Sequence, residues 1–373
     1  MENYFTENIL ICDVLHDKLT NFHGLVVGHN ETMDLNGKNV YLACDANLVK
    51  NLDKAKTVLA VKNISINSGD FRKIPIGQVP LNVHNVGILF KNYFDDGKNY
   101  FNLIKDSHKF QSLTESNKKK KALRSGIYLS NVTKNNGLKF NLLRCSSNFD
   151  GPTENFRNID RYIIKETNYL ANKFFVRPVK LNHVLAQIYE NKKIKIDGKT
   201  YHKKARIGEH SDKTKDMRKD GIIVFCSFYD YFNMPNNYVY KKYNVLTKLK
   251  FRLKKRNNKY KNEFEIILYP NSVFMISLRT NRLYTHKIVP SALEIKNIPT
   301  RMGYTIRCSN TEAIFKDKTY IIDNELIELQ KPTIEQIDKL KQLYLEENKT
   351  NKMVFYHKTY FSLNDGDYLK PLV

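Results

Sequence analysis

The sequence lacks the features that are typical of secreted, zinc-binding and membrane-spanning proteins. Tryptophan is absent, and only five of the 373 residues are cysteine. The cysteines are scattered and include no C-x-x-C pair, which argues against a disulfide framework or a zinc ribbon. The N-terminus has no signal-peptide pattern, and the apolar runs are far too short to cross a bilayer. We therefore expect an intracellular protein, in cytoplasm or nucleus, without a membrane-spanning segment.

Acidic residues are also few, 38 against 62 basic ones, and the formal net charge is +24. Such a charge predicts attraction to a polyanion such as nucleic acid or an anionic membrane face. The heavy use of Lys, Asn, Ile and Tyr is also typical of A·T-rich genomes, so a solvated basic surface is the alternative. We predict that DNA or RNA phosphates bind two basic segments, with contacts from Lys118, Lys119, Lys120, Lys121 and Arg124, and from Lys250, Arg252, Lys254, Lys255 and Arg256. The sequence gives no indication of an oligomeric state.

Short apolar runs separated by turn signals predict a mainly β chain in three parts. Residues 1–117 form an N-terminal β-rich extension of unknown role, with strands at 25–27, 40–43 and 58–61. Residues 118–315 form the main domain, and residues 316–373 form a C-terminal extension with a docking helix. The basic run at Lys118–Lys121 predicts a linker or an exposed loop at the first boundary.

The main domain should contain strands and at least one helix. The runs 126–129 and 138–143 flank Lys134-Asn135-Asn136-Gly137, which predicts a β-hairpin. Periodic apolar residues from Ile159 onwards predict a helix with one buried face. Further strands are predicted at 181–189, 222–228, 249–253, 264–268, 273–278 and 304–307. In the tail, Thr333 and Gln336 form a capping-box pair before an apolar stripe, which predicts a helix.

His210 and Asp212 stand two residues apart in the segment Ile-Gly-Glu-His-Ser-Asp. On an extended segment such residues project from the same face, about 7 Å apart. They suit a metal ion with mixed nitrogen and oxygen ligands, although a surface pair or a helix cap gives the same pattern. His286 supplies a second imidazole, 74 residues after Asp212. Two histidines and one carboxylate on one face, with open positions opposite, mark the non-haem Fe(II) oxygenases.

Two arginines and a polar pair accompany these residues. Arg301 and Arg307 are six residues apart and share one face of an extended segment. A guanidinium binds a carboxylate in bidentate fashion, so two of them suit a dicarboxylate co-substrate. Ordinary surface basicity is the alternative. Gln187 and Tyr189 share a face of another segment and could bond the far end of that dicarboxylate, unless they belong to a buried strand.

These segments together resemble the AlkB-type 2-oxoglutarate- and Fe(II)-dependent dioxygenases over roughly residues 120–310. The resemblance lies in their order: L-N-H-V-L-A-Q-I-Y, I-G-E-H-S-D, a distant His, and R-x-x-x-T-x-R. It implies an α+β, mainly β fold, with a double-stranded β-helix (jelly-roll) core and flanking helices. It also implies that His210, Asp212 and His286 hold Fe(II).

The resemblance further implies the co-substrate contacts and the reaction. Arg301, helped by Tyr189, would bind the distal carboxylate of 2-oxoglutarate, and Arg307 would lie near the end that chelates the metal. Gln187 stands where the family usually has Asn, and it keeps the amide with one more methylene group. The implied reaction consumes O₂ and 2-oxoglutarate, yields succinate and CO₂, and hydroxylates a substrate C–H. On an N-methyl group the products are formaldehyde and a free amine.

Three functions are compatible with these residues. The first is oxidative demethylation of nucleic acid, in DNA repair or on RNA, where a base must be extruded and stacked on aromatic or apolar side chains. Tyr128, Phe140, Phe156 and Tyr231 are candidates for this role, and each could instead be a core residue. The second is a protein or small-molecule hydroxylase, because a fold does not fix its substrate. The third is a non-catalytic nucleic-acid-binding protein, against which the complete iron and co-substrate set argues.

Overall fold

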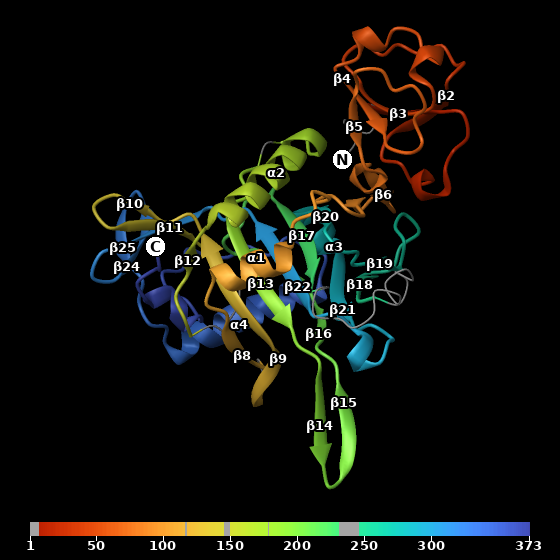
Figure 1. Ribbon diagram of the computed structural model, residues 1–373. Coiled ribbons are helices and arrows are strands. Elements are labelled where there is room, and N and C mark those ends of the chain that lie inside the picture. Colours follow the sequence, from red (N-terminus) through yellow and green to blue (C-terminus); the bar gives the residue numbers. More distant parts are fainter. Residues whose placement is uncertain (1–6, 116–117, 145–149, 178, 231–245) are drawn as a thin grey trace.

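The computed structural model describes residues 7–115, 118–144, 150–177, 179–230 and 246–373, and the protein is mainly β with few helices (Figure 1). Within these ranges, none of the helices is long and apolar enough to cross a membrane. The strands of these described ranges form five sheets. Two of these sheets face each other across the cavity described below.

The N-terminal sheet is parallel, and its inner strands β1 and β3 are buried on both faces. Its strand order is β2 (Leu25–Gly28), β1 (Asn8–Cys12), β3 (Asn39–Ala43), β4 (Thr57–Val61) and β5 (Arg72–Ile74). A parallel sheet covered on both sides requires continuous apolar strands. The segments NILIC and NVYLA meet this requirement, and every residue of β1 and β3 is buried. The predictions of strands at 25–27, 40–43 and 58–61 are confirmed.

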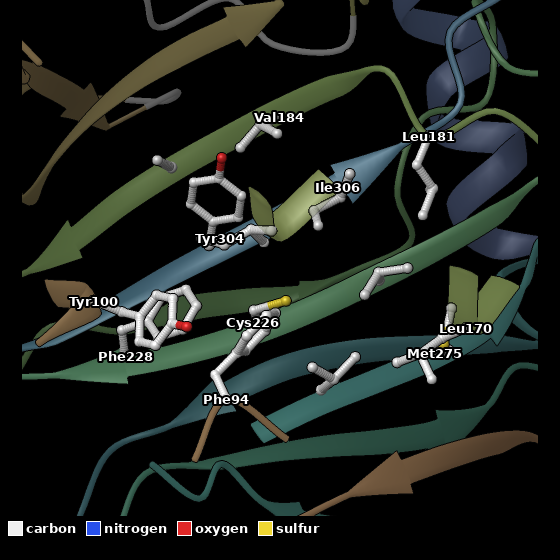
Figure 2. Packing of buried hydrophobic residues seen from close by; sticks show 14 of the residues in the cluster. Phe94, Tyr100, Leu170, Leu181, Val184, Cys226, Phe228, Met275, Tyr304 and Ile306 are labelled. Carbon is white, nitrogen blue, oxygen red and sulfur yellow. The ribbon is translucent and has the colours of Figure 1, made fainter. Parts of the chain in front are cut away.

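The central sheet has nine strands and carries most of the core. In order these are β12 (Glu154–Asn155), β9 (Lys118–Ser130), β13 (His183–Tyr189), β22 (Arg301–Arg307), β17 (Ile222–Tyr229), β20 (Ser272–Ser277), β7 (Gly87–Phe90) and β6 (Leu81–Val83), with β8 (Gln111–Glu115) paired to β9. Helices α1 (Tyr100–Ser107) and α2 (Asn158–Phe174) contribute to the apolar core on one face. Figure 2 shows this packing, in which the rings of Tyr100 and Phe228 stack with centroids 5.2 Å apart.

A smaller sheet lies against the other face of the central sheet. It consists of β16 (Ile207–His210), β21 (Tyr284–Val289), β18 (Lys248–Leu253) and β19 (Glu263–Ile267), and the short helix α3 (Leu278–Leu283) leads from β20 into β21. Phe251 and Phe264 of this sheet pack with Phe274 and Ile276 of the central sheet. Aromatic and aliphatic side chains thus hold the two sheets face to face.

Two further sheets and one helix complete the chain. One sheet joins β10 (Thr133–Lys134), β11 (Leu138–Leu142), β23 (Thr311–Phe315), β24 (Thr319–Asp323) and β25 (Glu325–Glu328), and the other is the hairpin of β14 (Lys192–Ile196) and β15 (Lys199–Lys203). Helix α4 spans Ile334–Lys349 and has the predicted capping box. The Thr333 side chain accepts a hydrogen bond from the Gln336 backbone, and Gln336 Oε1 accepts one from the Thr333 backbone.

Two local predictions are wrong. Lys118–Lys121 is not a linker or loop, because its backbone begins the long strand β9, which pairs with β8 across the predicted boundary at 117. Residues 126–129 do not form a hairpin with 138–143 but pair with residues 184–187 of β13. Ile127, Tyr128 and Leu129 are all buried, so their segment needs a place inside a sheet and not in an isolated hairpin. The predicted turn itself is present between β10 and β11.

Candidate metal and co-substrate site

A cavity of about 530 Å³, including its open mouth, lies between the central sheet and the smaller sheet. Its floor is formed by alternate residues of neighbouring central strands, since side chains i and i+2 of a strand share a face. These are Leu185, Gln187 and Tyr189 of β13, Arg301, Gly303, Thr305 and Arg307 of β22, and Phe225 and Ser227 of β17. His210, Asp212 and His286 line its opposite side. All seven residues predicted for the metal and the co-substrate therefore line one cavity.

The two histidines come from neighbouring strands, where His210 of β16 pairs directly with His286 of β21. Asp212 follows two residues after the end of β16. Its Oδ1 lies 3.6 Å from Nε2 of His210 and 3.8 Å from Nε2 of His286. One ligand atom from each residue lies within 4.8 Å of the others, and among the described residues this is the group of His, Cys and acidic side chains that could hold a metal ion.

Hydrogen bonding and packing orient both imidazoles. Nδ1 of His210 donates to the carbonyl of Gly208 at 2.9 Å, which leaves the Nε2 lone pair available on the cavity side. The ring of His286 lies 5.6 Å, centroid to centroid, from the rings of Phe225 and of Phe251. Burial, reinforced by the nearby His210, lowers the pKa of His286 to about 3. His286 is therefore neutral at pH 7, as a metal ligand must be.

Asp212 is held at its backbone and at one carboxylate oxygen. Its backbone N–H donates to Asn281 Oδ1, and Asn281 Nδ2 donates to its carbonyl, both at 2.9 Å. Its Oδ2 accepts from Nε and Nη2 of Arg307 at 2.9 and 2.7 Å. Burial raises the pKa of Asp212, but Arg307 and His210 outweigh it and hold that pKa well below its usual range. The carboxylate stays charged, and Oδ1 remains directed at the two histidines.

Arg301 lies in the same cavity without a hydrogen-bond partner for much of its guanidinium. The residue is 4% exposed, and its Nε and Nη2 are buried and unbonded among the described residues. Its Cζ lies 4.0 Å from the ring centroid of Tyr189, which stabilises the cation through the face of the ring. Leaving a buried charged donor unpaired costs free energy. The arrangement is suited to an anion that enters the cavity.

Tyr189, Gln187 and Gly303 surround this guanidinium. Tyr189 lies opposite Arg301 in the β13–β22 pairing, and its hydroxyl donates to Gln187 Oε1 at 3.3 Å. Gly303 lies opposite Gln187, and a Cβ there would come within 3.1 Å of both Arg301 and Tyr189. The missing side chain keeps the space beside Arg301 open.

Sequence reasoning did not identify Gly303, Asn281, Phe225 or Phe251. For Asn281 there was no local signal, because a polar residue in a short helix becomes recognisable only when its partner, Asp212, is known. Glu209 and Ser211, which flank His210, turn away from the cavity side. Glu209 pairs with Arg252 at 2.5 Å, and Ser211 Oγ donates to the Tyr284 carbonyl at 3.0 Å.

The predicted phosphate-binding residues are only partly available to a ligand. Lys250 pairs with Glu263 of the adjacent strand, and Arg252 pairs with Glu209. Lys254 Nζ donates to the carbonyl of Glu347 at 2.6 Å, and burial lowers its pKa to about 8. Lys255 and Arg256 are exposed, and Arg124 is half-buried. The side chains of Lys118, Lys119, Lys120 and Lys121 lie outside the described residues.

The proposed base-stacking aromatics lie elsewhere. Tyr128, Phe140 and Phe156 are 3%, 3% and 5% exposed and belong to apolar clusters, so their alternative interpretation as core residues is confirmed. Tyr231 lies outside the described residues. Among the residues that the structure describes, the Tyr and Phe side chains that line the cavity are Tyr189 and Phe225.

No protein-family model matches the sequence, and no curated protein sequence matches it. The structure is similar to the solved structure of OsALKBH1 with a TM-score of 0.39 and 12% identity, over 61% of this chain and 99% of that one. It is also similar to a Pseudomonas putida prolyl-4-hydroxylase with a TM-score of 0.27 and 10% identity, over 50% of this chain and 69% of that one.

Proposed function

We propose that this protein is an Fe(II)- and 2-oxoglutarate-dependent dioxygenase that demethylates alkylated nucleic acid. The observation that supports it is one cavity with polar groups that lack partners at each of its two ends. At one end, three side chains direct lone pairs at a common point, and at the other a buried guanidinium has unbonded donors. A dicarboxylate that chelates a metal with one end and reaches Arg301 with the other would satisfy both.

The residues of the first end fit Fe(II). Two neutral imidazoles and one carboxylate are the donor set of non-haem iron oxygenases. Neighbouring ligand atoms of an octahedral ion with bonds of about 2.1 Å lie about 3.0 Å apart. The observed distances from Asp212 Oδ1, 3.6 Å to His210 and 3.8 Å to His286, are slightly wider, so small inward movements of the half-buried His210 and of the Asp212 side chain would bring the three ligand atoms to this spacing.

The residues of the second end fit 2-oxoglutarate. Arg301 would take the distal carboxylate in bidentate fashion, and Tyr189 would hold the guanidinium plane by stacking, while its hydroxyl would turn from Gln187 Oε1 to donate to that carboxylate. Arg307 already binds Oδ2 of Asp212, so its role is to fix that carboxylate and to add positive charge near the metal-binding end.

When bound, iron with 2-oxoglutarate and O₂ supplies the oxidation of a substrate C–H. The chain supplies orientation and exclusion of water. Asn281 and Arg307 hold Asp212, the Gly208 carbonyl holds His210, and Phe225 and Phe251 pack against His286. Gly303 leaves room for the co-substrate beside Arg301.

We also propose that the two facing sheets form a double-stranded β-helix core, and that the chain divides into the three predicted parts. The β8–β9 pairing and the place of β6 and β7 in the central sheet favour an earlier start for the catalytic part, near Leu81 instead of residue 118. Limited proteolysis followed by expression of residues 1–80 and 81–373 would test this division.

Nucleic acid is the favoured substrate class because the net charge is +24 and cationic surfaces supply most sequence-independent affinity for phosphates. The test is succinate release with Fe(II) and 2-oxoglutarate, in the presence of methylated DNA, methylated RNA or protein extract. Stimulation by a methylated nucleic acid, with release of formaldehyde, supports the proposal. Stimulation by protein alone would identify a protein hydroxylase. A protein that does not bind Fe(II) and shows no turnover, but still binds nucleic acid, would be a non-catalytic module.

A further inference from the structure

The hairpin β14–β15 projects away from the body of the molecule, beyond both sheets of the cavity (Figure 1). Its strands pair in register from Lys192 with Lys203 to Ile196 with Lys199. Asp197 and Gly198 connect them with φ angles of 50° and 73°, as a tight turn of type I′ requires. Five-residue strands rising about 3.3 Å per residue give the hairpin a length of about 17 Å.

This hairpin concentrates positive charge. Residues 190–206 contain seven basic side chains against the two acids Glu190 and Asp197. Lys192 and Lys203 lie directly opposite each other, and like charges in that position destabilise a ribbon. Glu190 pairs with Lys192 at 3.1 Å, and Lys204 Nζ donates to the Ser291 carbonyl at 2.7 Å. The strand residues of β15 are all exposed. A polyanion would relieve this repulsion.

The hairpin is inserted between two strands that line the cavity. Tyr189, three residues before Lys192, and Ile207, four residues after Lys203, both face the cavity. At the base of the hairpin, the Ala205 N–H donates to Asn191 Oδ1 at 2.9 Å. A molecule bound along the hairpin is therefore brought to the rim of the cavity.

We propose that β14–β15 is an arm that binds the phosphates of double-stranded nucleic acid and holds the duplex beside the cavity. The inference rests on the proposed function and names the surface through which that site would meet its substrate. Directly paired residues of an antiparallel ribbon share a face. Lys193 and Lys195 therefore occupy one face, and Lys192, Lys199 and Lys203 occupy the other.

Cations on both faces favour a duplex over other polyanions. A flat anionic membrane would contact one face only, and a single strand offers one row of phosphates. A duplex groove offers a row on each side, and the major groove of B-form DNA, about 12 Å wide, admits a two-stranded ribbon.

The test compares two quadruple variants of the full chain. In the arm variant, Lys192→Gln, Lys193→Gln, Lys195→Gln and Lys199→Gln are combined. The matched control removes the same charge from four exposed lysines of the N-terminal sheet region, by Lys50→Gln, Lys54→Gln, Lys62→Gln and Lys73→Gln. This region lies at the far end of the molecule from the hairpin (Figure 1). The dissociation constant for a short labelled duplex DNA is measured between about 50 and 200 mM salt, beside the matching single strand and phosphatidylserine vesicles.

The arm variant should bind the duplex at least about 100-fold more weakly at low salt, and its slope of log K against log salt should fall by about 0.9 for each phosphate that the arm no longer neutralises. The control should change duplex binding by less than about threefold, because it removes only bulk charge. Equal losses in both variants, an unchanged arm variant, or a loss confined to vesicles or to the single strand would overturn the proposal.

The proposed function can fail separately. A wild-type protein that binds neither Fe(II) nor 2-oxoglutarate would refute the dioxygenase, whether or not the arm holds a duplex. If the protein is an iron- and 2-oxoglutarate-dependent enzyme but its arm variant binds duplex DNA as tightly as wild type, only the proposal for the arm is refuted.

Discussion

Two buried clusters of this protein, one around His108 and one in the cavity, are built from similar residue types but differ in whether their polar groups have hydrogen-bond partners. In the His108 cluster (His108, Glu154, Asp160 and Tyr304), Nδ1 of His108 bonds Glu154 at 2.9 Å and Nε2 bonds Asp160 at 2.8 Å. The Tyr304 hydroxyl donates to the second Asp160 oxygen at 2.7 Å. In the cavity, by contrast, Arg301 keeps unbonded donors, and Nε2 of each histidine lies 3.6 or 3.8 Å from Asp212 Oδ1, beyond hydrogen-bond distance.

The same imidazole ring therefore carries a different charge in the two places. Burial would lower the pKa of His108, but its hydrogen bonds with Asp160 and Glu154 outweigh burial and raise it to about 9. Burial, reinforced by His210 and Arg307 and only partly opposed by Asp212, lowers the pKa of His286 to about 3. A protonated ring has no lone pair for a metal, whereas a neutral one does. The two clusters are alike in burial and residue type, and what distinguishes the second is its unsatisfied polar groups beside a cavity.

The sharpest test of this contrast exchanges the two histidines for inert side chains. His286→Ala should abolish Fe(II) binding and lower succinate release by more than the roughly 100-fold that loss of an outer partner causes. His108→Gln should leave Fe(II) binding and turnover within about threefold at neutral pH and low temperature, where the protein remains folded. Metal titration and succinate release measure both. Equal losses of metal affinity in the two variants would break the comparison.

Substitutions of Arg301 and of Arg307 should have different effects on co-substrate binding and on the free energy of unfolding. Arg301→Met should raise KM for 2-oxoglutarate about 100-fold, since it removes a charged bidentate contact. It should leave the free energy of unfolding unchanged or higher, because a buried cation without a bonded partner is removed. Arg307→Met should instead destabilise the fold by about 3 kcal/mol, because the buried Asp212 carboxylate would lose its cationic partner. Urea unfolding and succinate kinetics give the two values, and a strongly destabilised Arg301→Met would contradict the assignment.

Stability should depend on pH through His108. Because its folded pKa is about 9 and its ordinary value is 6.5, its contribution is complete below pH 6.5 and is lost as pH rises through 9. The difference between these two pKa values corresponds to a contribution on the order of 3 kcal/mol. Urea unfolding at pH 6 and at pH 9.5 should show this loss in wild-type protein and a smaller loss in His108→Gln. The same pH dependence in both proteins would assign it to other groups.

The smallest expected effect is at Tyr189. Tyr189→Phe keeps the ring against Arg301 and removes only the hydroxyl that bonds Gln187. One hydrogen bond is worth about 1 kcal/mol, so KM for 2-oxoglutarate should rise about fivefold with kcat unchanged. A loss as large as that of Arg301→Met would mean that the hydroxyl, and not the guanidinium, carries the binding of the co-substrate.

Much of the fold and of the candidate site could be predicted because the signals are local. Alternation along β13 and β22 placed Gln187, Tyr189, Arg301 and Arg307 on defined faces, and apolar runs predicted the buried strands. The capping box at Thr333 predicted the start of α4. These features follow from backbone geometry, in which every second side chain of a strand shares a face and a helix needs its first N–H groups satisfied.

What the sequence alone determined is therefore the strand faces, the helix start and the residue types that could meet at a metal. Only the tertiary structure decided which strands pair and which side chains contact each other. Residues 126–129 pair with β13 and not with the segment 138–143 that follows them in sequence. Lys250 forms an ion pair with Glu263, and Arg252 forms one with Glu209. Asn281 forms hydrogen bonds with Asp212. Each contact joins elements that are separate strands or loops in sequence, so its free energy depends on packing that no local pattern encodes. Whether a buried group is satisfied or left open, as at His108 and at Arg301, is decided at that level.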